Sequence, residues 1–97
     1  MRRAFFAPSF LQEIEDIAFY IEQRFGEAAR SDFRKSLEHL CSLLCLFPTM
    51  GKLDHDYPTA FSGFVFRMNW VFFEYDDDEV RFMHIVDGRR EKPSFPF

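Results

Sequence analysis

The chain has 97 residues, enough for one hydrophobic core and too few for two. Its formal net charge is −4, and no stretch approaches the 18 consecutive apolar residues that suggest a membrane span. This balance is unlike the basic footprint of a nucleic-acid-binding domain, and acidic residues from Glu13 onward interrupt any signal-peptide core. We therefore expect a single cytoplasmic domain, residues 1–97, that binds neither membranes nor nucleic acids directly.

Phenylalanine is unusually frequent, with fifteen in the chain. A domain of this size buries only about two-thirds of its unfolded surface, so it cannot hide all of these rings. Exposed apolar patches commonly mark sites of contact with a partner. The composition therefore predicts a partner-binding surface that contains aromatic side chains.

The first predicted elements are a strand and a helix. Residues 2–6 are short and end in apolar side chains, which suits an edge strand. We expect Pro8-Ser9 to open a helix, because Ser9 followed by Gln12 is a capping-box pattern. One apolar stripe follows at helical spacing: Phe10, Ile14, Ile17, Ile21 and Phe25. Gly26 is the expected C-terminal stop.

A second helix is predicted from about residue 27 to residue 46, where Pro48 follows. Its apolar stripe comprises Ala29, Phe33, Leu37, Leu40 and Leu44. Cys41 and Cys45 lie four apart on this helix, where Cβ atoms are about 5–6 Å apart, beyond the roughly 3.5–4.5 Å of a disulfide. We expect two buried thiols, because His39 and the cysteines lack a second ligand pair for zinc.

The remaining elements predict an antiparallel sheet. Residues 48–60 contain helix and strand breakers and are expected to form a loop. Three β-rich runs follow, at 61–67, 70–75 and 80–86, joined by tight turns at Met68-Asn69 and Asp76–Asp78. The predicted fold is α+β, in the order β-α-α-β-β-β, with the helical hairpin packed on the sheet. Two prolines make residues 93–97 an extended C-terminal arm.

Positive charge is concentrated just after the last predicted strand. Residues 88–92 carry a net charge of +2 in an acidic chain, from Arg89, Arg90, Glu91 and Lys92. Arginine presents a planar fork that suits a carboxylate or a phosphate. Two interpretations stay open: a structural ion pair, for example of Arg90 with Asp16, or contact with an acidic partner surface.

Several motifs, in order, resemble a known family. They lie in residues 10–29, 47–52 and 64–90, and the matching positions are Asp16, Pro48, Gly51, Lys52, Arg67, Tyr75, Gly88 and Arg90. The chain is similar to the ParE/RelE toxin superfamily of bacterial type II toxin–antitoxin systems, and to the ParE branch in particular. Many relatives have His before the terminal Gly, where this chain has Asp87, so no role of that His can be transferred.

The resemblance implies one of two mechanisms. RelE-like members are ribosome-dependent endoribonucleases that cut mRNA, whereas ParE-like members bind DNA gyrase without catalysing a reaction themselves. A metal-free ribonuclease needs a general acid, a general base and cations near the phosphate. The segment after His84 offers no proton donor or acceptor of that kind, we expect Tyr75 to be a half-buried sheet residue, and the acidic chain suits ribosomal RNA poorly. The ParE-like mechanism is therefore favoured, with the RelE-like ribonuclease as the alternative.

The resemblance also implies partners and binding residues. A cognate antitoxin, ParD-like or similar, is expected to form a hetero-oligomer with the chain, through a helix in a groove or an added strand. DNA gyrase is the expected target. The predicted target-binding residues are Arg89, Arg90, Lys92, Phe95 and Phe97, and the predicted basic residues of the sheet face are Arg67 and Arg81. No catalytic residue, cofactor or metal site is expected; the run Asp76–Glu79 lacks the spacing of a calcium loop.

Overall fold

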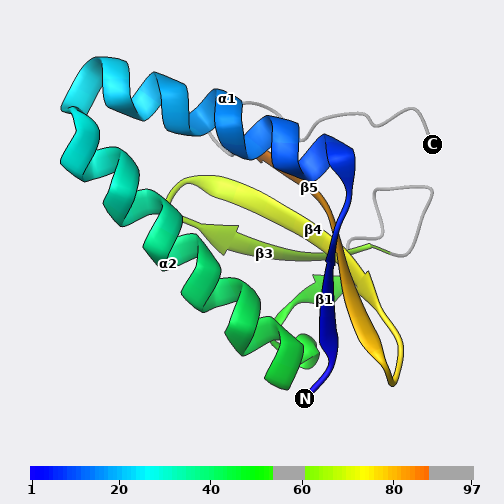
Figure 1. The fold of residues 1–97 in the computed structure, drawn as a ribbon. Helices are drawn as coiled ribbons and strands as arrows, with labels where there is room; N and C mark the ends of the chain where they lie inside the picture. The colour runs from blue at the N-terminus through cyan, green and yellow to red at the C-terminus, as the bar shows by residue number, and fades with distance from the viewer. Residues whose placement is uncertain (54–60, 88–97) are drawn as a thin grey trace.

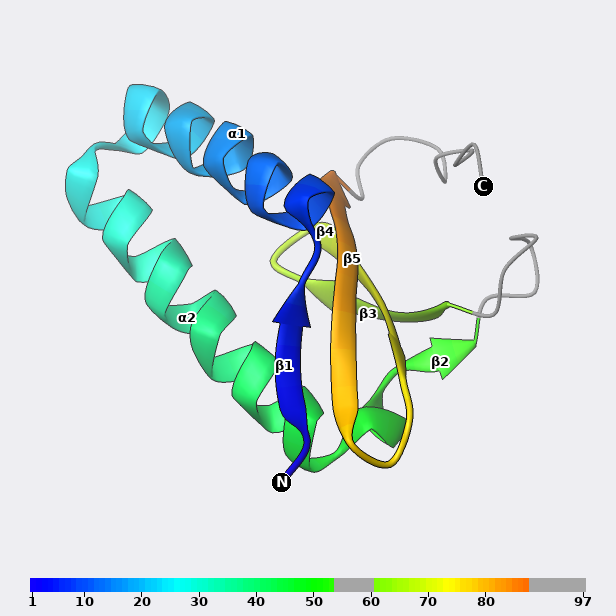
Figure 2. The ribbon, with the colours of Figure 1, turned by 45° about the vertical axis from the view of Figure 1, so that its right-hand side comes forward.

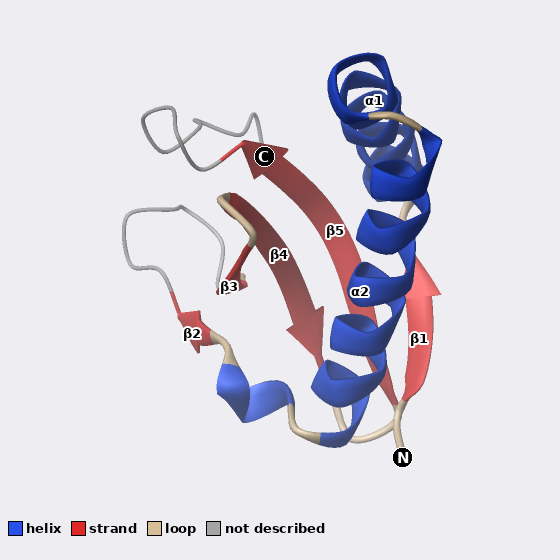
Figure 3. Ribbon diagram, turned by 90° about the vertical axis from the view of Figure 1, so that its left-hand side faces the viewer, coloured by secondary structure: helices blue, strands red, loops and turns tan. Residues whose placement is uncertain are grey.

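A computed structural model describes residues 1–53 and 61–87. Its elements are β1 (Arg3–Phe6), α1 (Pro8–Phe25), α2 (Glu27–Leu46), the short 3₁₀ helix η1 (Pro48–Met50), β2 (Lys52–Leu53), β3 (Ser62–Phe66), β4 (Asn69–Tyr75) and β5 (Glu79–Asp87). The five strands form one sheet in the order β1-β5-β4-β3-β2. The two helices form a hairpin on one side of this sheet (Figures 1 and 3).

The predicted α+β architecture is confirmed, and the sheet is mixed. β1 lies at one edge and runs parallel to β5, whereas β2, β3, β4 and β5 pair antiparallel with their neighbours. β2 lies inside the stretch that was expected to be a loop. Two residues are too few to show a strand periodicity, so only pairing with β3 reveals it.

The core lies between the helical hairpin and the sheet. From α2 it takes Phe33, Leu37, Leu40 and Leu44, four of the five residues of the predicted stripe, and from the sheet it takes Val71, Phe73, Val80, Phe82 and Ile85. On α1 the stripe holds only in part: Phe10 is fully buried, but Phe25 is 70% exposed. The helices diverge from the sheet toward their shared turn, so the last residue of α1 lies away from the core (Figure 2).

The predicted capping box at Ser9 is wrong. Ala7 is the N-cap of α1, and Pro8 occupies the first turn, where its fixed φ and missing N–H suit the helix. Ser9 is therefore already inside the helix, and its Oγ donates to the Met83 carbonyl oxygen at 2.8 Å. Gly26 does end α1, with φ of 94°, a conformation that favours glycine.

The turn between β3 and β4 lies one residue earlier than predicted. Phe66 pairs with Asn69, so the two loop residues are Arg67 and Met68, with φ of 48° and 69°. A two-residue hairpin loop requires positive φ, which costs a residue other than glycine about 1 kcal/mol or more. The Asn69 side chain donates to the Arg67 carbonyl oxygen at 3.1 Å and supports this turn.

Three further expectations can be compared with the structure. Cys41 and Cys45 are free, buried thiols as predicted, and burial raises the pKa of Cys41 to about 12 and also raises that of Cys45. Aromatic rings are indeed exposed, among them Phe5, Phe6 and Phe19. In the described part of the chain, neither helix is long and apolar enough to cross a membrane.

Candidate functional site

The five predicted target-binding residues come shortly after β5 in the sequence. Arg89, Arg90, Lys92, Phe95 and Phe97 lie outside the described residues. The described part of the molecule that bears on them is β5 itself and the groups that hold its two ends. These groups come from the β4–β5 turn, from β1 and from α1.

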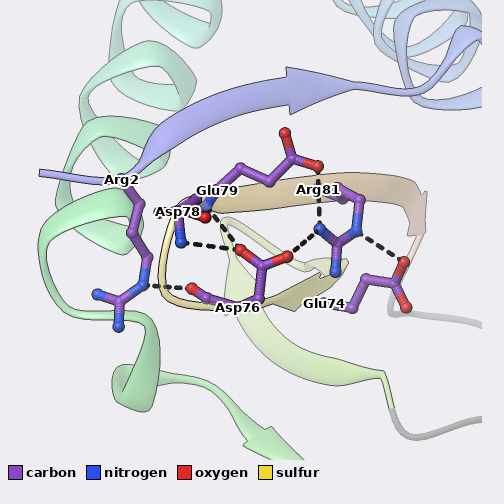
Figure 4. Close-up of polar contacts among 6 residues, drawn as sticks. All are labelled: Arg2, Glu74, Asp76, Asp78, Glu79 and Arg81. Atoms are coloured by element: carbon purple, nitrogen blue, oxygen red, sulfur yellow. Dashed lines mark hydrogen bonds and ion pairs between the residues drawn. The ribbon is translucent and has the colours of Figure 1, made fainter.

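Arg81 lies on β5, between the buried residues Val80 and Phe82, and so faces away from the helices. Its Nε donates to Glu74 Oε1 at 2.9 Å, and its Nη1 lies 2.9 Å from both Asp76 Oδ2 and Glu79 Oε1 (Figure 4). These three bonds raise the pKa of Arg81 above its ordinary value. The guanidinium predicted as part of a basic sheet face is thus surrounded by three carboxylates of its own chain.

Asp76 organises the turn between β4 and β5. Its Oδ1 accepts from the backbone N–H groups of Asp78 and Glu79 at 2.8 and 2.9 Å. The bond from Arg81, followed by these two backbone bonds, lowers the pKa of Asp76 to about 2. The Nε of Arg2 donates to the Asp76 carbonyl oxygen at 2.7 Å and so ties β1 to the turn (Figure 4).

The acidic run is therefore a hairpin turn, as predicted. In residues 1–53 and 61–87, no group of three or more His, Cys, Asp or Glu side chains is arranged to hold a metal ion. Tyr75, at the start of the turn, is 37% exposed; its ring packs near Phe73 and beneath the Arg2 guanidinium. These contacts are those of a packed sheet tyrosine.

Arg67 does not share a surface with Arg81. It lies in the β3–β4 turn, where its Nη2 is 3.0 Å from Asp32 Oδ2 and 2.8 Å from Ser36 Oγ, both on α2. The guanidinium predicted as part of a basic sheet face thus lies against α2. The positive φ of Arg67 turns the chain so that its side chain spans from the sheet to the helix.

No pattern in the sequence signalled the contacts at the other end of β5. Glu13 on α1 places Oε1 3.2 Å from His84 Nδ1 and accepts from the Ile85 backbone N–H at 3.3 Å. Burial raises the pKa of Glu13 above its ordinary value, an effect larger than the opposing effects of His84 and the Ile85 N–H. Glu13 looks like any polar residue of an amphipathic helix, so only the three-dimensional pairing of α1 with β5 identifies it.

A cleft of about 250 Å³ opens between the first half of α1, the middle of α2 and β1. Its apolar walls are Phe6, Phe10, Leu11, Ile14, Leu37 and Cys41, and its charged rim is Glu15, Arg34 and Glu38. Leu11 is 50% exposed and Phe6 39% exposed. An ion pair between Arg34 and Glu15 links the two helices at the rim.

The fold and these surfaces define a small α+β domain in which a helical hairpin covers one side of a mixed sheet. Residues 4–92 match the family model described as "ParE toxin of type II toxin-antitoxin system, parDE". The chain belongs to this family of ParE toxins.

A solved structure titled "Chromosomal ParDE TA system from P. aeruginosa" has the same fold. The TM-score is 0.77 at 10% sequence identity, and the match covers 90% of this chain and 96% of that chain. No curated protein matches the chain in sequence.

Proposed function

We propose that this ParE-family toxin acts by binding DNA gyrase without catalysing a reaction itself, and that a cognate antitoxin neutralises it. The family assignment supports the toxin class, and the ion pairs of Arg67 and Arg81 support the choice of mechanism. Arg67 and Arg81 are both bonded to carboxylates of the chain, which leaves them poorly placed to neutralise a phosphate. This observation favours a protein target over RNA cleavage.

The proposed target-binding residues are those of the basic segment and the arm after it. Arg89, Arg90 and Lys92 supply cations for acidic side chains of the target, and Phe95 and Phe97 supply apolar anchors. Interface energy is usually concentrated in a few Arg and aromatic residues. The net positive charge of residues 88–92 in an acidic chain is the sequence feature that supports this assignment.

The double variant Arg89→Ala/Arg90→Ala tests the proposal. Purified wild-type protein is expected to inhibit supercoiling by gyrase, and the double variant to be at least about tenfold weaker, the loss expected when hot-spot arginines are truncated. Arg3→Ala/Lys35→Ala is the matched control, because it removes the same charge from two exposed positions elsewhere. Cleavage of mRNA on translating ribosomes, with gyrase unaffected, would instead support the RelE-like mechanism.

For the antitoxin, we propose the cleft between α1, α2 and β1 as a docking site. Its apolar walls with a charged rim suit a segment that inserts an apolar side chain and surrounds it with polar ones. Arg2 and Arg3 precede the exposed Phe5 and Phe6 on β1, which favours an antitoxin segment that carries acidic residues beside its apolar anchor.

Leu11→Asp tests the docking site. Leu11 lines the cleft and is 50% exposed, so an aspartate there places a charge where the antitoxin buries apolar surface, with little effect on the core. Phe19→Asp is the matched control, since Phe19 is 60% exposed on the same helix and does not line the cleft. Antitoxin affinity should fall at least about tenfold for Leu11→Asp only. Equal affinities of both variants would exclude this cleft.

A further inference from the structure

The two halves of β5 have different neighbours on the side of β1. Residues Glu79–Phe82 pair with β1, where the Arg3 N–H donates to the Asp78 carbonyl oxygen at 2.9 Å and the Ala7 N–H donates to that of Phe82 at 3.0 Å. β1 then ends, because Pro8 begins α1. Beyond the end of β1, the first turns of α1 lie beside the end of β5 (Figure 2), where they contact Met83 and Ile85.

Beyond this point, side chains of α1 replace the backbone groups of β1 as hydrogen-bond partners of β5. Ser9 Oγ donates to the Met83 carbonyl oxygen at 2.8 Å, and Glu13 Oε1 accepts from the Ile85 N–H at 3.3 Å. Ser9 and Glu13 are four residues apart and therefore lie on one face of the helix. They bind the carbonyl of one β5 residue and the N–H of the residue two positions on, the groups that a neighbouring strand would bind.

The changeover coincides with a β-bulge. Phe73 pairs with Phe82 and Phe72 pairs with His84, so Met83 is the extra residue on β5. A bulge bends the strand and changes the direction of the residues after it. Since Ile85 is buried, its N–H cannot turn to water and needs the partner that Glu13 provides.

We propose that Glu13, assisted by Ser9, is a positioning residue for target binding: it fixes the bulged end of β5, from which the chain continues into the basic residues Arg89 and Arg90. Glu13 itself need not touch the target. The inference rests on the proposed function, in which those arginines bind gyrase. Holding residues 83–87 in one geometry reduces the conformational freedom that this end of β5 loses on binding.

The test combines two readouts on purified full-length protein. The ¹H–¹⁵N spectrum reports the backbone of residues 85–90, and inhibition of gyrase supercoiling reports function. Glu13→Ala removes the bonds of Glu13 to the Ile85 N–H and to His84. It is expected to shift the amide signals from Ile85 through Arg90 and to weaken inhibition about tenfold. Glu13→Gln keeps an acceptor for the Ile85 N–H and should restore both readouts to within about threefold of wild type. Gln12→Ala, on the same helix, is the control and should change neither.

The outcomes separate this inference from the proposed function. Signal shifts confined to Ile85 with full inhibition by Glu13→Ala overturn the inference, and so does a Glu13→Gln variant as weak as Glu13→Ala. Should the wild type fail to inhibit gyrase, the proposed function falls, and the amide signals of Arg89 and Arg90 still decide whether Glu13 positions them. Should Glu13→Ala not fold, Ser9→Ala serves in its place, with the same pattern expected at smaller amplitude.

Discussion

The two ends of β5 are stabilised in different ways. At its beginning, β5 pairs with β1 through backbone bonds and its turn is closed by Arg81, Asp76 and Arg2. At its end, backbone pairing on that side is replaced by the side chains of Ser9 and Glu13. Backbone pairing is independent of side-chain identity, whereas side-chain pairing can be altered by one substitution or by a proton. The beginning of β5 therefore depends on backbone bonds, and its end depends on two side chains of α1.

The largest expected effect comes from breaking the backbone pairing of the first half. The Arg3 and Ala7 N–H groups donate to β5, so the alternation of a strand directs the N–H of Phe5 to β5 and that of Ala4 away from it. Phe5→Pro should reduce the free energy of unfolding by about 3 kcal/mol or more, and Ala4→Pro by much less. Urea unfolding followed by circular dichroism measures both. Equal losses would show that β1 does not depend on these bonds.

A smaller loss of unfolding free energy is expected when the side-chain contacts along the second half of β5 are removed. Ser9→Ala/Glu13→Ala removes the Ser9–Met83 and Glu13–Ile85 hydrogen bonds, each of which contributes about 1 kcal/mol, together with the contact of Glu13 with His84. Removing a carboxylate that burial disfavours offsets part of this loss, so the double variant should lose only about 1 kcal/mol in the same urea experiment. A loss as large as that of Phe5→Pro would remove the distinction between the two halves.

Glu13 also makes the second half sensitive to pH in a defined direction. Its pKa is raised in the folded state, so the folded protein gains stability as pH falls through that raised value toward the ordinary value near 4.5. Glu13→Gln should lack this gain. The difference in unfolding free energy between wild type and Glu13→Gln should therefore change between neutral pH and about pH 4.5. A difference that stays constant would contradict the raised pKa.

The smallest change in stability is expected at the β4–β5 turn, where acidification lowers stability instead of raising it. The pKa of Asp76 is lowered from about 3.8 to about 2, so its contribution is present above pH 3.8 and is lost as pH falls toward 2. Arg81→Gln removes the largest cause of that shift. The stability difference between wild type and Arg81→Gln should shrink on acidification through this range, as thermal unfolding at several pH values can measure. A stability difference between wild type and Arg81→Gln that persists undiminished at pH 2 would contradict the lowered pKa of Asp76.

These contrasts also explain what the sequence could predict. The stripe Phe33, Leu37, Leu40 and Leu44 has one period and one buried face, so periodicity located α2 with its observed bounds. At the start of α1 two signals competed, and Pro8 outweighed the capping pattern of Ser9. Local patterns and periodicity do not predict how distant elements align. The contact of Arg67 with α2 depends on that alignment, so the sequence did not predict it.

Glu13 is the clearest case of a residue that the sequence could not reveal. Its role depends on where β1 stops beside β5 and on the extra residue Met83, both of which are properties of pairing across about 70 positions. The basic segment, residues 88–92, could be predicted from the sequence because clustered charge is a property of consecutive residues. Local chemistry could thus be predicted, and its structural support could not.

Native-state hydrogen exchange at the Ile85 amide shows whether side chains of α1 replace β1 along the second half of β5. We expect Glu13→Ala to speed exchange at Ile85 by about tenfold or more relative to wild type, while exchange at Val80 stays unchanged. Glu13→Gln should retain the protection. An Ile85 amide that remains equally protected in Glu13→Ala would contradict the claim.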